Sequence, residues 1–91
     1  MEQQQMSEIE KNDYVCRRLN AIMNLVIQKN PTEEDENNIC DTITELSRNY
    51  PELDFTPFYK RLRDIYDLRG LEPRIERLKL LFLIGERINN D

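Results

Sequence analysis

The sequence predicts an all-α fold, a four-helix antiparallel bundle that consists of two α-hairpins. Only two of its 91 residues are glycine, 34% are charged, and the apolar residues recur at helical spacing. This composition is typical of a helical domain and differs from that of a disordered chain or a β-sandwich. Proline and capping signals divide the chain into helices at approximately 8–29, 33–49, 57–69 and 73–88. We expect a disordered lead-in over residues 1–7 and a single helical domain over residues 8–91.

The first helix is expected to begin after Ser7, which stands three residues before Glu10 in the spacing of a capping box. Its apolar residues share one face when they are placed at helical spacing. They are Ile9, Cys16, Leu19, Ile22, Met23, Val26 and Ile27. The helix should end near Lys29, because the residue before Pro31 is disfavoured in the helical conformation.

The second helix should begin after Thr32, and its apolar stripe is narrow, which is typical of a peripheral helix. The stripe consists of Ile39, Ile43, Leu46 and Tyr50. The acidic run over residues 33–36 occupies the first turn of this helix. A cation site or a mimic of nucleic acid would explain the run. We favour the simpler explanation that these carboxylates are stabilised by the helix dipole.

Proline and glycine mark the boundaries of the last two helices. Thr56-Pro57 is typical of an N-cap followed by the first helical residue. In the connector before Thr56, Leu53 and Phe55 are expected to pack against the helices of the bundle. Gly70 should close the third helix in the left-handed conformation, and Pro73 should open the fourth. Because the links are short, helices that are neighbours in sequence should pack antiparallel.

The fourth helix contains five consecutive apolar residues, 80–84, which no single helical face can hold. The side expected to face the core consists of Ile75, Leu78, Leu81, Phe82, Gly85 and Ile88. Leu80 and Leu83 lie on the other side, with Ile84 between the two. Either the rest of the chain or a binding partner covers these three residues, and the sequence leaves both explanations open. Gly85 costs a helix interior about 1 kcal/mol relative to alanine, which indicates a close approach by a neighbouring helix.

Catalysis is not expected for this chain. It has no histidine, which removes the usual general base and most zinc sites. Two isolated glycines cannot form a phosphate-binding loop, and the paired carboxylates lie on faces expected to be exposed. We therefore predict no catalytic, cofactor-binding or metal-binding residues. Cys16 and Cys40 are expected to be reduced thiols of a cytoplasmic protein, and no apolar stretch is long enough to span a membrane.

Charge is divided unevenly along the chain. Residues 1–56 contain 5 basic and 12 acidic residues, a balance of −7, whereas residues 57–91 contain 8 basic and 6 acidic residues, a balance of +2. The acidic half disfavours general affinity for nucleic acid, which depends on neutralising phosphates. Nucleic-acid binding through the arginines of the third and fourth helices is therefore the least favoured hypothesis.

The favoured hypothesis is a non-enzymatic protein–protein interaction domain, which would be an adaptor, a small subunit of a complex or a homodimer. Arginine beside exposed leucine is typical of binding interfaces, although solvated cations paired with nearby carboxylates would give the same pattern. The predicted partner-binding residues lie on the outer face of the fourth helix. They are Arg77, Leu80, Leu83, Ile84 and Arg87.

The alternative is a small acidic inhibitor or regulator, similar in general character to many phage-encoded inhibitors. Such a protein would block a basic nucleic-acid-binding surface of its target, and its binding would weaken as salt increases. The acidic surface predicted for this role consists of Glu33, Glu34, Asp35, Glu36, Asp41 and Glu45.

Overall fold

The computed structural model describes residues 8–87, and within this range the chain forms four α-helices and no β-strand. The helices are α1 (Glu8–Gln28), α2 (Glu33–Asn49), α3 (Thr56–Leu68) and α4 (Glu76–Arg87). The prediction of an all-α fold with four helices is confirmed. The expected lead-in over residues 1–7, with its Ser7 cap, and the predicted end of the last helix at residue 88 lie outside the described residues.

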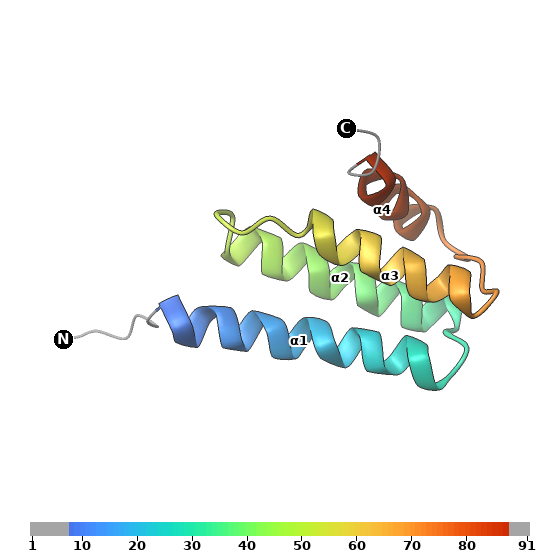
Figure 1. Ribbon diagram of the computed structural model, residues 1–91, viewed down its shortest axis with the longest axis horizontal. Coiled ribbons are helices and arrows are strands. Elements are labelled where there is room, and N and C mark those ends of the chain that lie inside the picture. The colour runs from blue at the N-terminus through green and yellow to red at the C-terminus, as the bar shows by residue number, and fades with distance from the viewer. Residues whose placement is uncertain (1–7, 88–91) are drawn as a thin grey trace.

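The helices form two hairpins that stack on each other (Figure 1). α1 pairs with α2 and α3 pairs with α4, while α1 also lies against α3 and α2 against α4. α2 and α3 occupy opposite corners, so the expectation that all sequence neighbours pack directly is wrong for this pair. The connector explains the difference, because buried Phe55 packs with Val15 and Leu46 and so brings the start of α3 beside α1.

All four helices contribute to one central core. Val26, Ile43, Leu62 and Leu78 belong to this core, one on each helix, and each is at most 2% exposed, while Leu46 belongs to a smaller cluster with Val15 and Phe55. The ring of Tyr66 meets the ring of Phe82 edge-on, with 5.0 Å between the centroids, and this contact joins α3 to α4. Burying large side chains in this way contributes about 1.5–3 kcal/mol each, which makes the core the main source of stability.

α1 buries a narrower stripe than the sequence predicts. Val15, Ile22 and Val26 are buried, whereas Ile9 is 81% exposed and Cys16 is exposed. Ile27, also placed on the predicted face, is 52% exposed. α1 lies at the edge of the molecule with only α2 and α3 beside it, so its outlying apolar residues find no neighbour to cover them.

Side-chain caps set several helix ends. Thr32 caps α2 as predicted, because its hydroxyl accepts from the Asp35 N–H and the Asp35 carboxylate accepts from the Thr32 N–H, each at 3.0 Å. Thr56 is the first residue of α3 and not its cap. The Asp54 carboxylate instead accepts from the Thr56 N–H at 3.0 Å and from its hydroxyl at 2.7 Å. Gly70 has the predicted left-handed conformation, with φ of 67°.

Candidate functional site

Three apolar side chains of α4 point away from the core. Leu80 is 52% exposed, Leu83 is 53% exposed and Ile84 is 42% exposed, whereas Leu78 and Phe82 on the opposite side are buried. We call Leu80, Leu83 and Ile84 the α4 apolar face. α4 packs against α2 and α3 and lies on the far side of the molecule from α1 (Figure 1), so its outer side is left uncovered within the described residues.

Gly85 fixes how α4 is oriented on α3. A Cβ atom at this position would lie 2.7 Å from the Lys60 backbone nitrogen and 2.9 Å from the Lys60 Cα. No side chain fits there without moving backbone, so the expected close helix contact is confirmed. Because this buried glycine holds the inner side of α4 against α3, the α4 apolar face is directed toward solvent.

Charged residues border the α4 apolar face on both sides. Arg77 donates to Asp41 of α2 at 2.8 Å, and this hydrogen bond raises the pKa of Arg77. Glu86 forms an ion pair with Arg63 of α3, with 3.0 Å between a carboxylate oxygen and Nε. Lys79 is exposed and forms no ion pair with any described residue. The predicted site residue Arg87 is the last residue of α4, and its side chain lies outside the described part of the structure.

Other exposed apolar residues occur singly. Ile27 lies on α1, and Leu68, which is 88% exposed, lies near the end of α3. Isolated apolar residues are normal on protein surfaces and need no partner. The α4 apolar face differs from them because three such side chains share one side of a single helix within five residues of sequence.

Glu36 is buried, although the sequence predicts it to be part of the exposed acidic surface. That prediction is wrong for this residue. It is 1% exposed, and its carboxylate accepts hydrogen bonds from the Tyr66 hydroxyl at 2.9 Å and from the N–H groups of Arg74 and Ile75 at 2.7 and 3.1 Å. A negative charge is favourable at this position because it caps the N-terminus of α4. These bonds also explain why α4 begins at Glu76 and not at residue 73.

Tyr66 of α3 is 1% exposed. Burial, together with the hydrogen bond to Glu36, raises the pKa of the Tyr66 hydroxyl. A polar cavity of about 330 Å³ lies beside this pair, with Arg74 in its wall. Arg74 donates through Nε to the Pro31 carbonyl at 3.2 Å. Arg74 therefore links the turn before α4 both to Glu36 and to the turn before α2.

The remaining acidic residues do not form one free surface. Asp35 belongs to the α2 cap and pairs with Lys29 at 3.0 Å. Asp41 is bound to Arg77, so a residue of the acidic set neutralises one of the predicted partner-binding residues. Glu45 lies 3.7 Å from Arg18. Glu33 and Glu34 are the exposed members for which no ion pair with a described residue is found.

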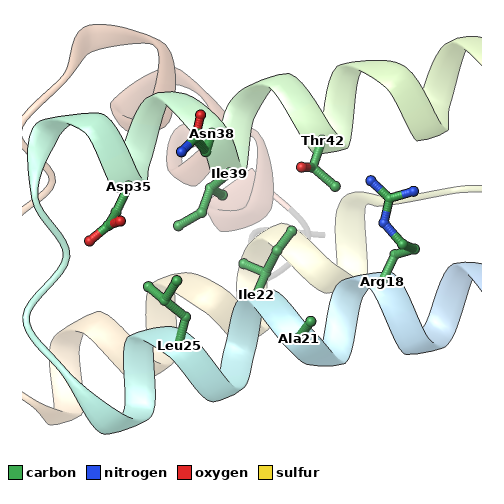
Figure 2. A pocket seen from close by; sticks show the side chains of 8 residues that line it. All are labelled: Arg18, Ala21, Ile22, Leu25, Asp35, Asn38, Ile39 and Thr42. Carbon is green, nitrogen blue, oxygen red and sulfur yellow. The ribbon is translucent and has the colours of Figure 1, made fainter.

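A shallow groove of about 200 Å³ lies between α1 and α2. Figure 2 shows Ile22, Leu25 and Ile39 between the two helices, with Arg18 near one end and Asp35 near the other. Both charged groups already have partners within the chain, since Arg18 also donates to the Tyr14 hydroxyl at 2.5 Å. The groove therefore gives no indication of a ligand.

Arg69, which follows the last residue of α3, and Lys60 within α3 both form contacts with other residues of the chain. Arg69 donates to the carbonyl groups of Val26 at 2.5 Å and Lys29 at 2.8 Å, which caps the end of α1. Lys60 pairs with Asp64 at 3.0 Å. Sequence reasoning missed the capping role of Arg69, because nothing in the sequence indicates that the end of α3 meets the end of α1.

Within residues 8–87, no cluster of acidic or thiol side chains has the arrangement of a metal site. No helix in this range has the length and apolar character required to cross a membrane. Cys16 and Cys40 are both free thiols, exposed and buried respectively. The chain matches no protein-family model, no curated protein and no solved structure.

Proposed function

We propose that this chain is a non-enzymatic helical protein–protein interaction domain that binds a protein through the α4 apolar face. The observation that supports the proposal best is the exposure of Leu80, Leu83 and Ile84 on a helix whose other side is firmly packed. A contiguous apolar surface bordered by charged residues is typical of an interface. We place this interaction in the cytoplasm, since the free thiols of Cys16 and Cys40 suit a reducing compartment.

The acidic-inhibitor hypothesis has less support. Glu36 is inside the protein, and Asp35, Asp41 and Glu45 are paired with cations of the same chain. An acidic surface attracts a basic target through charges that are not already neutralised. Salt-insensitive binding of the partner would favour the α4 apolar face, whereas binding that is lost at high salt would favour the acidic surface.

The proposal is tested by replacing two residues of the α4 apolar face with aspartate. The Leu80→Asp/Leu83→Asp variant should keep the helical circular dichroism of the wild type, because both side chains are half exposed. It should no longer retain proteins from an extract of the source cells when it is immobilised. Leu68→Asp is the matched control, since it removes an equally apolar and more exposed leucine from α3.

Two results would contradict the proposal. If the double variant unfolds, the two leucines support the fold and are not an interface. If the double variant and the Leu68→Asp control retain the same proteins as the wild type, binding occurs elsewhere on the molecule.

A further inference from the structure

We infer that the partner of the α4 apolar face is a second copy of this chain, with the two α4 helices packed antiparallel about a two-fold axis. This inference rests on the proposed function and names its partner. It is carried by the self-complementary order of apolar and charged residues on the outer side of α4.

The apolar residues fit the seam of a two-helix contact. Leu80 and Leu83 occupy the a and d positions of a heptad, three residues apart on the exposed side of α4. An antiparallel pair centred between Leu81 and Phe82 brings Leu80 of one copy level with Leu83 of the second copy. The axis generates the same contact again, so four leucines meet at the centre. Ile84 flanks this cluster, beside the aliphatic part of Arg77 of the second copy.

The charged residues support the same register. Lys79 and Glu86 both occupy g positions, on the side of α4 that faces α3. In the antiparallel pair, Lys79 of one copy and Glu86 of the second copy differ by about 3 Å in height along the helix axis, from two residues at 1.5 Å each. Side chains of this length span that offset, and although Arg63 contacts one oxygen of the Glu86 carboxylate, the other oxygen is left to accept from Lys79. The pairing gives Lys79 the ion pair that it does not have within the described part of the chain, and symmetry makes two such pairs.

A parallel pair lacks this complementarity. It would place Glu76 of one copy against Glu76 of the other, since equal positions meet in a parallel dimer. The antiparallel register instead places Glu76 level with residue 87 of the second copy, which is an arginine in the sequence. Like charges that face each other are destabilising, so the charge order of α4 selects one orientation.

The interface is small, because α4 has only 12 residues. We therefore expect a weak dimer whose average mass rises over protein concentrations of roughly 10 μM to 1 mM. The measurement is sedimentation equilibrium of the full chain across this range. Wild-type protein that stays monomeric at the highest concentration would overturn the inference.

Charge exchange tests the register directly. Lys79→Glu places two carboxylates at each pairing point, and Glu86→Lys places two ammonium groups there. Each variant alone should dimerise about tenfold more weakly than the wild type, and an equimolar mixture of the two should recover the wild-type affinity. Recovery in the mixture is specific for contact between positions 79 and 86 of different copies. Equal affinities for the wild type, both variants and the mixture would overturn the antiparallel arrangement.

Two further measurements separate this inference from the proposed function. Leu68→Asp should dimerise like the wild type, and Leu80→Asp should not dimerise, while both should remain helical. A wild-type chain that is monomeric, but that retains another protein through Leu80 and Leu83, would overturn the inference and leave the proposed function standing. A dimer that Leu80→Asp does not weaken would show that the copies meet through another surface, which also overturns the inference.

Discussion

Replacing Glu36 should reveal how strongly one buried carboxylate stabilises this fold. In Glu36→Leu, the Tyr66 hydroxyl and the N–H groups of Arg74 and Ile75 lose their acceptor. The fully buried hydroxyl should cost about 2 kcal/mol, and each of the two partly buried N–H groups about 1 kcal/mol. The sum, about 4 kcal/mol, is a large part of the roughly 5–14 kcal/mol expected for a chain of this length.

Glu36→Gln is the matched control because it preserves the shape of the side chain. Its carbonyl oxygen can still accept from Arg74 and Ile75, and its amide group can donate to the Tyr66 hydroxyl oxygen. The charged hydrogen bonds become neutral ones and the Tyr66 proton loses its acceptor, so the expected cost is about 2 kcal/mol, which is half that of leucine. Urea denaturation followed by circular dichroism gives the free energy of unfolding for both variants.

The relative stability of the two variants tests whether the three hydrogen bonds to Glu36 stabilise the fold. Leucine should be the more damaging replacement, because it leaves three donors without an acceptor. A Glu36→Leu variant that is as stable as the wild type would refute the reasoning, since it would show that water or rearrangement satisfies those donors. Equal losses for leucine and glutamine would show that the charge matters and the geometry of the hydrogen bonds does not.

Three further predictions concern other contacts. Gly85→Ala should destabilise the protein by about 1–3 kcal/mol despite the better helix propensity of alanine, because its Cβ would clash with the Lys60 backbone. A gain in stability measured by urea denaturation would contradict this prediction. Arg69→Ala should cost about 1–2 kcal/mol and increase amide hydrogen exchange at the end of α1, whereas unchanged exchange there would disprove the capping role. Burial raises the pKa of Tyr66 above its ordinary value, so the unfolded chain loses this proton first and stability should fall above about pH 10 by about 1.4 kcal/mol per pH unit. Tyr66→Phe should reduce that slope in urea titrations at high pH, and an identical slope would contradict the assignment.

The elements of this fold can be predicted from local sequence signals. Thr32 and Gly70 mark helix boundaries because capping depends on residues that are close in sequence, and the structure confirms both. The two sides of α4 are also predictable, since helical spacing alone separates Leu78 and Phe82 from Leu80 and Leu83. The side of α4 that carries the candidate site could therefore be predicted, but the sequence left open whether the rest of the chain covers it, and only the structure shows that it is exposed.

Contacts between distant parts of the chain could not be predicted. Glu36 resembles its acidic neighbours in sequence, and only the position of α4 places its carboxylate inside the protein. The exposure of Cys16 and Ile9 similarly depends on how little of α1 the other helices reach. Periodicity identifies which side of a helix is apolar, but the arrangement of neighbours decides how much of that side is buried.

In each hairpin, one helix end is capped by a side chain from the other hairpin. Arg69, directly after α3, caps the C-terminus of α1, and Glu36 of α2 caps the N-terminus of α4. Both hairpins would therefore have unsatisfied backbone groups if they were separated. These contacts join residues about 40 positions apart, which makes folding depend on non-local encounters despite the helical content. We expect residues 8–87 to unfold as one cooperative unit. A fragment that contains only α1 and α2, or only α3 and α4, should not fold independently.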